Sequence, residues 1–464
     1  MARSERSPNA IESILKQART APESEWGELA IQLARRLLAR AESEADTDEE
    51  RRSQGLGARL ARRESQVLST VLTDRVHRSK DAARVVETVR RLTHRFSSLD
   101  FLPPLDRLEL RALRAFGPLV PELTATALQE RLRREASPYV VDATPEEMAS
   151  HLEQRRQRGM RVNLNYLGEE ILGERQAEKH IEEYLSLLAR PDVDAISVKL
   201  SSVFSQVSVL AFESTVERVV ARLRRVFSAS LASRPRKLIY FDMEAFKDFE
   251  LTLEVFERLL LDPDFQGVEA GIAVQAYLPD SMGAIDRLIA LGRERARLGA
   301  APPRVRLVKG ANLAMERVEA SLHRWAVPVF PTKVEVDAQY KRLLRRTFEP
   351  ESSRFLRVGV GSHNLFDVAY ALVLRAHYGA EERVELEMLE GMAEPLARVV
   401  ASAAGGLLLY APAVLPEHFS SAISYLVRRL DENSSEENYL RHAFSMRVGD
   451  DAFEEQRRRF EKSL

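Results

Sequence analysis

Polar residues of ligand-binding types follow eight short apolar runs in the second two thirds of the chain. The runs cover residues 161–168, 195–203, 237–244, 271–278, 305–312, 357–363, 384–391 and 406–413. Their polar residues are Asn163, Asn165, Lys199, Ser201, Asp242, Glu244, Gln275, Tyr277, Lys309, His363, Asn364, Glu387, Glu390 and Tyr410. If the runs are parallel strands of one barrel, their carboxyl ends surround a single mouth, where barrel enzymes hold their catalytic groups. The pattern therefore predicts one site of binding or catalysis.

The spacing of these residues also favours a common direction for their side chains. Lys199 and Ser201 are two residues apart in one run, and Asp242 and Glu244 are two apart in the next. Side chains with this period point to the same face of a strand. Buried charges there are costly unless they are paired or bound to a ligand. Two explanations remain open from the residues alone, namely a ligand site and a network of barrel polar groups that satisfy one another.

A further group of charged residues follows the last run. Tyr425, Arg428, Arg429 and Glu432 lie on one broad face of a predicted helix, 418–433. Two adjacent guanidinium groups suit a carboxylate, because each offers a planar fork of donors; a solvated helix face is the alternative. The cations predicted at the mouth are Lys199, Arg306, Lys309, Arg428 and Arg429, against the anions Asp242, Glu244 and Glu432. This surplus of two positive charges favours a phosphate-bearing cofactor, a carboxylate substrate, or both.

The eight runs alternate with helical segments, and this alternation predicts the fold. Eight strand-plus-helix units are what a closed (β/α)8 TIM-type barrel requires. Residues 1–150 carry apolar residues at helical spacing and predict an all-helical N-terminal arm and domain. We therefore expect three parts, the helical region 1–150, the barrel 151–435 and a helical tail 436–464. The long interval 312–351 predicts an extra helix or lid.

Composition narrows the chemistry. Lys plus Arg (69) nearly balance Asp plus Glu (70) among 464 residues, so nothing in the net charge points to nucleic acid. We interpret the basic stretch 155–161 as a solvated helix end. The chain has no cysteine, which excludes disulfides, Cys-ligated zinc, iron–sulfur clusters and thiol nucleophiles; we expect no metal site. There is no long apolar run and no signal-like N-terminus, so we expect a cytoplasmic protein.

Residues 161–439 resemble the proline dehydrogenase family, particularly the dehydrogenase half of the bifunctional proline utilization A proteins. Eight collinear stretches carry the resemblance: 196–201 (ISVKLS), 241–244 (FDME), 274–277 (VQAY), 306–311 (RLVKGA), 362–364 (SHN), 389–395 (LEGMAEP), 409–412 (LYAP) and 425–433 (YLVRRLDEN). Each is weak alone, and their common order makes the signal specific. Asn312 and Leu313 depart from the aromatic residues that the family often has after this lysine loop, so contacts there are expected to differ.

The resemblance implies a noncovalent FAD at the barrel mouth and oxidation of L-proline to Δ1-pyrroline-5-carboxylate. In this sequence it implies that Lys199, Arg428 and Arg429 hold the substrate carboxylate and that Asp242 orients Lys199. It implies that Leu389, Tyr410 and Tyr425 wall the pyrrolidine ring. The positions that it implies for FAD binding are Gln275, Arg306, Val308, Lys309, Gly310, Ala311, His363, Asn364 and Glu432.

The resemblance also implies partners. The final electron acceptor would be a membrane quinone, reached by peripheral membrane contact, and the bifunctional relatives carry an aldehyde dehydrogenase domain. A homo-oligomer is expected as well. Two other functions remain alternatives: a catalytically inactive barrel that serves as an oligomerising or regulatory module, and a cofactor-free lyase or aldolase with Lys309 or Lys199 as Schiff base.

Overall fold

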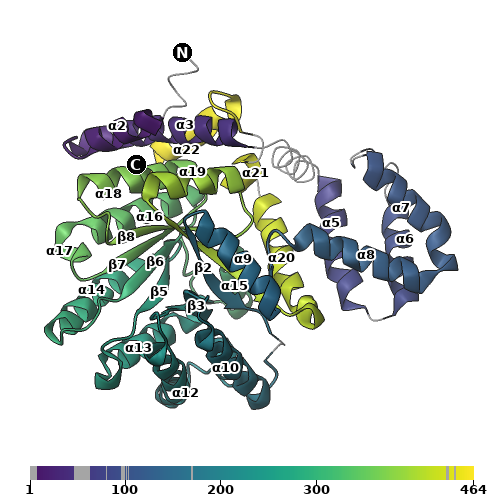
Figure 1. Cartoon of the computed structure of the whole chain (residues 1–464), viewed down its shortest axis with the longest axis horizontal. Coiled ribbons are helices and arrows are strands. Elements are labelled where there is room, and N and C mark those ends of the chain that lie inside the picture. The colour runs from purple at the N-terminus through teal and green to yellow at the C-terminus, as the bar shows by residue number, and fades with distance from the viewer. Residues whose placement is uncertain are drawn as a thin grey trace.

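The computed structural model describes residues 8–45, 63–79, 81–95, 100, 102, 104–168, 171–434, 438–443 and 446–464. Within these ranges it does not describe the side chains of 8, 9, 63, 65, 66, 69, 70, 73, 77, 78, 104, 105, 424 and 428–434. Its centre is a closed barrel of eight parallel strands (Figure 1). In chain order these are β2 (Met160–Tyr166), β3 (Ala195–Val198), β4 (Leu238–Phe241), β5 (Ala270–Gln275), β6 (Arg304–Val308), β7 (Arg357–Gly361), β8 (Val384–Leu389) and β9 (Leu407–Val414). Pairing of β9 with both β8 and β2 closes the barrel, and β1 (Val141–Asp142) adds to β9. The predicted (β/α)8 fold is confirmed.

The strands form where the sequence has its apolar runs, because parallel strands are covered on both faces. Residues of β3, β4 and β5 are buried throughout. Every predicted strand is present, but several end earlier than predicted. The run 195–203 becomes helical after Lys199, where Leu200–Val203 form the short helix α11. Ser201 is therefore exposed on a loop helix, and the prediction that it shares the barrel face of Lys199 is wrong.

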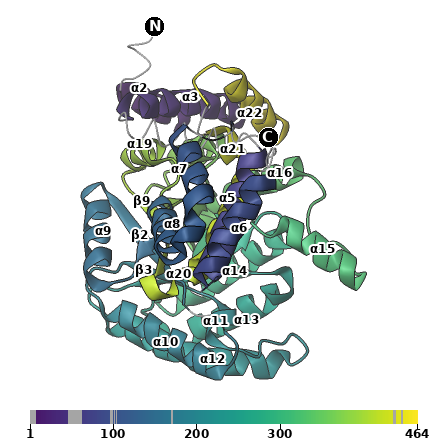
Figure 2. The same ribbon diagram turned by 90° about the vertical axis from the view of Figure 1, so that its right-hand side faces the viewer.

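Helices surround the barrel and fill the intervals between strands. They are α9 (Pro145–Gln157), α10 (Glu174–Ala189), α12 (Phe212–Ala232), α13 (Phe249–Leu261), α14 (Ser281–Arg297), α16 (Lys333–Phe348), α17 (Pro350–Ser353), α18 (Leu365–His377), α19 (Glu394–Ala404) and α20 (Phe419–Ser434). The long interval after β6 also contains α15 (Leu313–His323), as predicted, and Figure 2 shows α15 projecting from the barrel. Among the described residues, no helix combines the length and apolar character needed to cross a bilayer.

The basic end of α9 corrects one prediction. Arg155 is only 8% exposed and forms ion pairs with Glu390 and Glu394 in the loop and helix that follow β8. Carboxylates distant in sequence compensate the buried guanidinium, so the interpretation of this stretch as a solvated helix end is wrong for Arg155. Arg161 lies at the other end of the barrel, where it donates to Glu385.

The N-terminal helices pack in two places. Helices α2 (Pro8–Ala18) and α3 (Trp26–Glu44) lie across α18 and α19, and their apolar residues join the main hydrophobic core (Figure 1). Helices α5 (Arg63–Arg78), α6 (Ala82–Arg95), α7 (Pro104–Phe116) and α8 (Pro121–Ala136) share a separate core. Helix α5 packs along α20, so this helical group lies against the last helix of the barrel.

The C-terminal tail contains the helices α21 (Tyr439–Ala443) and α22 (Asp451–Lys462). Helix α22 packs on α16 and α18. Phe366 of α18 contacts Phe453 and Phe460 of α22, with ring centroids 5.1 and 5.7 Å apart. The tail thus buries apolar surface of the barrel helices.

Candidate active site

Arg306 is the central charge of the barrel interior. It lies on β6, in register with Gly359 of β7, and is only 5% exposed. Its Nε donates to the carboxylate of Glu387 on β8, and its guanidinium carbon lies 3.7 Å from the ring centroid of Tyr240 on β4. Burial alone would lower the pKa of Arg306, but Glu387 and other nearby acidic groups outweigh it and raise the pKa. The guanidinium is therefore held as a cation.

This network has room because the neighbouring residue of β7, Gly359, has no side chain. A Cβ at Gly359 would lie 1.9 Å from Oε1 of Glu387 and 3.0 Å from the hydroxyl of Tyr240. Those two atoms form a hydrogen bond of 2.6 Å, in which Tyr240 donates. Any larger residue at position 359 would push the carboxylate away from Arg306.

Asp242 lies directly after β4 and connects the network to the last strand. It accepts a hydrogen bond of 2.7 Å from the hydroxyl of Tyr410 and one of 3.1 Å from Ser197, and Nη1 of Arg306 is 3.3 Å away. Lys199 forms no ion pair with any residue that the structure describes. Among the described residues, the ion-pair partner of Asp242 is Arg306; the role of Asp242 in orienting Lys199 stays a prediction.

Three buried polar side-chain atoms of the strands β2, β5 and β6 lack a hydrogen-bond partner among the described residues. They are Nη2 of Arg306, Oε1 of Gln275 and Oδ1 of Asn163. Nε2 of Gln275, in contrast, donates to the backbone carbonyls of Met243 and Glu244 at 3.3 and 3.4 Å. Buried polar atoms are normally satisfied, so these atoms favour a ligand that offers both donors and acceptors. The barrel polar groups thus satisfy one another in part, and a remainder is available to a ligand.

Lys309 begins the loop after β6 and lies in a buried cluster of charges. Its Nζ is 2.5 Å from Asp337 of α16 and 2.5 Å from Asp367 of α18. Lys333 contacts Asp337 at 2.9 Å, and Lys341 contacts Asp367 at 3.4 Å. Burial would lower the pKa of Lys309, but the two carboxylates raise it, so this lysine is held charged.

The next residue, Gly310, has a φ of 108°, which favours glycine. A Cβ at this position would lie 1.6 Å from the ring of Tyr277. The loop therefore follows the Tyr277 ring closely, and only glycine permits this course. Ala311, which follows, is exposed, and Val308 is in register with Gln275 of β5.

The predicted residues of β7 and β8 have separate local roles. Nε2 of His363 accepts a hydrogen bond of 2.8 Å from the backbone N–H of Leu389, which joins the ends of these strands. Asn364 caps α18, because its side chain accepts from the backbone N–H groups of Phe366 and Asp367. Capping thus occupies the side-chain oxygen of Asn364.

The predicted wall of the substrate pocket comes from three elements. Leu389 of β8 is the Cα partner of Tyr410 on β9. Tyr425 of α20 is 7% exposed and belongs to an apolar cluster against which Tyr410 packs. Arg428, Arg429 and Glu432 follow on the last turns of α20, and their side chains lie outside the described residues.

The sequence interpretation missed several residues of this network. Tyr240 and Ser197 lie within apolar runs, where nothing distinguishes an inward hydroxyl from a core position. Asp337 and Asp367 belong to helices. The signal that could have found Asp337 is its position between Lys333 and Lys341, each one turn away.

Residues 148–442 match the family model for proline dehydrogenase. The chain belongs to the proline dehydrogenase family. A solved structure of proline utilization A from Corynebacterium freiburgense is 40% identical, with a TM-score of 0.65, over 72% of this chain and 33% of that chain. Another, from Bdellovibrio bacteriovorus, is 25% identical with a TM-score of 0.75, over 92% of this chain and 43% of that chain.

A curated relative agrees with this assignment. The bifunctional protein PutA of Rhizobium meliloti is 29% identical over 285 residues, 57% of this chain and 22% of the relative. The chain therefore spans less than half the length of these three relatives. The proline dehydrogenase resemblance seen in the motifs is confirmed, and so is the barrel fold that it implied.

Proposed function

We propose that this chain is a flavoenzyme that oxidises L-proline to Δ1-pyrroline-5-carboxylate. The observation that carries the proposal is the buried Arg306, which is fixed by Glu387 and has Nη2 without a partner among the described residues. Membership of the proline dehydrogenase family supports oxidation of proline at this site.

The residues at the mouth fit FAD. Bound FAD would supply the acceptor for the hydride that leaves the ring carbon beside the proline nitrogen. The residues proposed to hold it are Gln275, Arg306, Val308, Lys309, Gly310, Ala311, His363, Asn364 and Glu432. Arg306 and Lys309 provide fixed cations, and fixed charges stabilise developing negative charge without reorganisation during reaction. The unpaired Oε1 of Gln275 and Nη2 of Arg306 offer an acceptor and a donor for its polar groups.

Substrate binding is proposed to depend on charge and on an apolar wall. Lys199, which forms no ion pair with the described residues, is proposed to bind the substrate carboxylate, and Arg428 and Arg429 add planar forks. Leu389, Tyr410 and Tyr425 are proposed to enclose the pyrrolidine ring. Asp242 keeps Tyr410 in place through the 2.7 Å hydrogen bond.

An absorption spectrum of the purified chain tests the proposal. We expect a yellow protein whose flavin absorbance bleaches when L-proline is added without oxygen. Hydroxyproline, added in parallel, measures the preference between the two substrates. A chain that stays colourless after incubation with FAD would contradict the proposal and support the inactive oligomerising module.

We further propose a membrane quinone as the final acceptor and an aldehyde dehydrogenase, as a further domain or a separate partner, as the consumer of the product. The support for the aldehyde dehydrogenase is the likeness to a relative described as bifunctional, and the quinone is proposed from the family resemblance of the motifs. Anaerobic reoxidation of the reduced flavin by a quinone analogue in vesicles tests the first part. A slow rate that vesicles do not increase would contradict it.

A further inference from the structure

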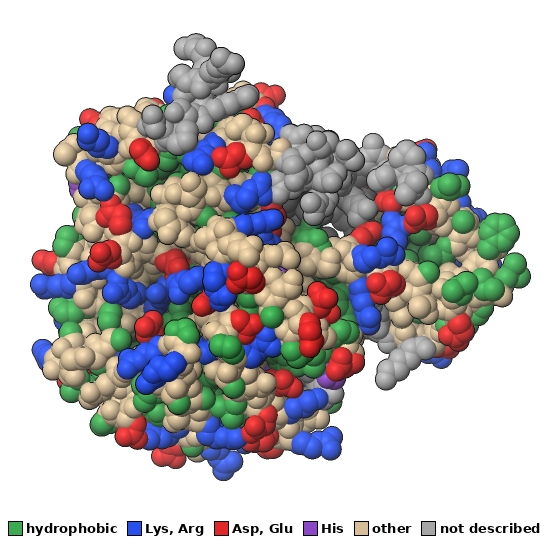
Figure 3. All heavy atoms as spheres, in the orientation of Figure 1, with side chains coloured by type: hydrophobic (Ala, Val, Ile, Leu, Met, Phe, Trp, Pro, Cys, Tyr) green, Lys and Arg blue, Asp and Glu red, His purple; other side chains and the backbone are tan. Residues whose placement is uncertain are grey.

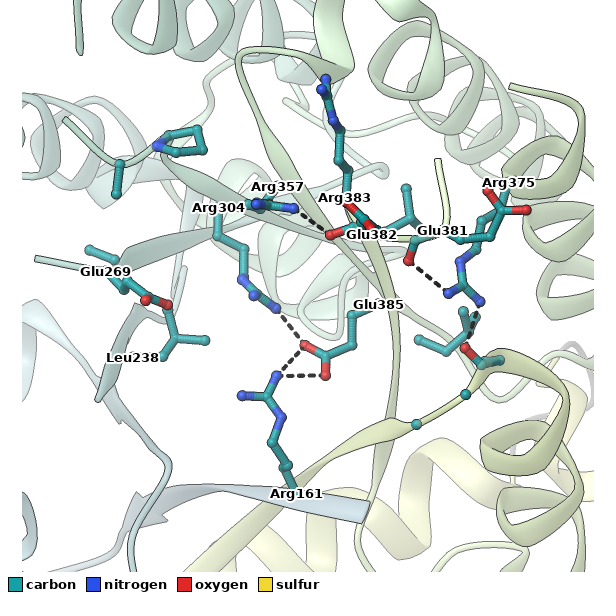
Figure 4. Close-up of a pocket in the computed structure, with 18 residues that line it drawn as sticks. Arg161, Leu238, Glu269, Arg304, Arg357, Arg375, Glu381, Glu382, Arg383 and Glu385 are labelled. Carbon is teal, nitrogen blue, oxygen red and sulfur yellow. Dashed lines mark hydrogen bonds and ion pairs between the residues drawn. The ribbon is translucent and has the colours of Figure 1, made fainter. Parts of the chain in front are cut away.

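A cavity of about 390 Å³ lies at the foot of the barrel, where the strands begin, opposite the mouth. Its walls come from the first residues of several strands, among them Arg161, Leu238, Arg304, Arg357 and Val384 (Figure 4). Cavities of this size commonly bind small molecules. Nothing in the proposed proline chemistry uses this end of the barrel.

The cavity is lined by five arginines and four glutamates. The charged residues of its lining are Arg161, Arg304, Arg357, Arg375 and Arg383, with Glu269, Glu381, Glu382 and Glu385. Figure 3 shows Lys and Arg side chains gathered in a band across the barrel, where Figure 1 labels β6 and β7. The net charge inside the cavity depends on which carboxylate forms an ion pair with which arginine.

One carboxylate serves two arginines. Glu385 accepts from Arg161 at 2.7 and 2.9 Å and from Arg304 at 2.5 Å, and Figure 4 shows both guanidinium groups converging on it. The carboxylate of Glu381 forms an ion pair of 3.0 Å with Arg19, a residue of the N-terminal region that does not line the cavity. Glu269 and Glu382 are exposed, so water screens their charges. The Arg161–Glu385–Arg304 group therefore keeps a net positive charge.

Two more arginines are held by neutral groups. Arg375 of α18 donates to the backbone carbonyls of Ala404 and Glu381, both at 2.8 Å, and Arg357 donates to the carbonyl of Glu382. Carbonyls orient a guanidinium without neutralising it. Within the described part of the chain, neither arginine has a carboxylate within ion-pair distance, and the buried Nε of Arg375 has no partner.

We propose that this cavity binds a small multivalent oxyanion, whose phosphoryl or neighbouring carboxylate groups are shared between Arg357, Arg375 and the Arg161–Arg304 pair. Guanidinium forks bind such groups with paired, charge-assisted hydrogen bonds. Arg383, exposed at the rim, adds long-range attraction. The site lies at the end of the barrel opposite the mouth, so its occupation does not depend on proline or on the proposed flavin.

Calorimetric titration of the full chain tests this site, with pyrophosphate and citrate as probes and sodium chloride holding the ionic strength constant. We expect saturable binding of one equivalent for at least one probe, and the stronger probe identifies phosphoryl or carboxylate chemistry. Arg357→Gln should weaken binding and raise the dissociation constant at least tenfold. Arg383 is exposed, so Arg383→Gln should leave the fold intact. It should raise the dissociation constant two- to fivefold.

Arg297→Gln is the matched control. Arg297 ends α14 at the same end of the barrel, is 75% exposed and pairs with Glu294, but it does not line the cavity. Its replacement removes the same charge and should change the dissociation constant less than twofold. Absence of saturable heat with both probes, or equal weakening by Arg297→Gln and Arg357→Gln, would overturn the proposal. Because binding is measured without proline, failure here leaves the proposed oxidation untouched.

Discussion

Arg306 and Glu387 form an ion pair inside the barrel, with the Arg306 side chain 6% and the Glu387 side chain 3% exposed. The two residues come from β6 and β8, so the pair spans the strand between them, and Gly359 on that strand leaves it room. This relationship makes the site part of the core. Chemistry at the mouth and stability of the barrel depend on the same charges.

Glu387→Gln should therefore destabilise the fold. The substitution keeps an acceptor for Tyr240 but leaves Arg306 with Asp242 as its remaining carboxylate in the described structure, at 3.3 Å. Loss of one partner of a buried pair costs about 3–5 kcal/mol. Urea unfolding of the chain without added flavin measures the difference in the free energy of unfolding.

Glu381→Gln is the control. Its ion pair with Arg19 is exposed, with side chains 63% (Arg19) and 40% (Glu381) accessible, so the substitution should cost less than about 1 kcal/mol. Equal small losses in both variants would show that the buried pair is not needed.

Comparison of Gly310→Ala with Gly299→Ala should distinguish the cost of backbone strain from the cost of a steric clash. Gly310 and Gly299 both have positive φ, 108° and 68°, but a Cβ at Gly299 meets no atom within 4 Å. Alanine at Gly299 should cost about 1–2 kcal/mol, because an L-residue is strained in the left-handed region. Alanine at Gly310 must also displace the Tyr277 ring, which should move Lys309 and weaken FAD binding at least tenfold. Flavin fluorescence titration and thermal melting of both variants measure these effects. Retention of full FAD affinity in Gly310→Ala would show that the course of this loop is not critical.

Alkaline pH should destabilise the chain through its buried tyrosines. Burial raises the pKa of Tyr370 to about 12, and burial together with Asp242 raises the pKa of Tyr410 well above its ordinary value. A pKa raised in the folded state gives stability that is complete below about pH 10 and is lost as pH rises through the folded value. Absorbance at 295 nm should show these groups ionising at a higher pH in the folded chain than in the urea-unfolded chain.

Tyr370→Phe provides the check on this pH dependence. Tyr370 is 4% exposed and packs edge-on against Phe460, at a ring distance of 6.0 Å. Between pH 10 and 12 the variant should lose unfolding free energy less steeply, by about 1.4 kcal/mol per pH unit for one proton. Identical slopes in the two proteins would mean that Tyr370 ionises as freely in the folded state as in the unfolded state.

The sequence predicted all eight strands because each is a continuous apolar run, which is what burial on both faces requires. It also singled out Asp242, Gln275 and Tyr410 through their positions at strand ends, whereas Arg306 entered through the predicted charge of the mouth and the family resemblance. It did not predict that Asp242 would pair with Arg306, because register decides which strand-end groups meet. The burial of Asp367 and Arg155 depends on how helices pack over the barrel, and no local pattern expresses that packing.

Replacement of either arginine of α20 should impair proline binding without loss of the cofactor. Arg428 and Arg429 are proposed to hold the substrate carboxylate, and hydrogen bonds to charged groups contribute about 1.5–3 kcal/mol each. Arg428→Gln and Arg429→Gln should therefore each raise the KM for proline by about tenfold or more. The visible flavin spectrum should stay unchanged, since neither residue is assigned to FAD.

Lysine at the same positions distinguishes charge from geometry. Arg428→Lys keeps the positive charge but loses the planar fork, so its KM should lie between those of the parent and the glutamine variant. Steady-state kinetics with flavin content measured in parallel decides the outcome. A KM unchanged in both glutamine variants would refute the substrate role, whereas loss of the flavin would assign these arginines to the cofactor instead. Because α5 packs along α20, the melting temperature of each variant also shows whether the contact between these helices survives the substitution.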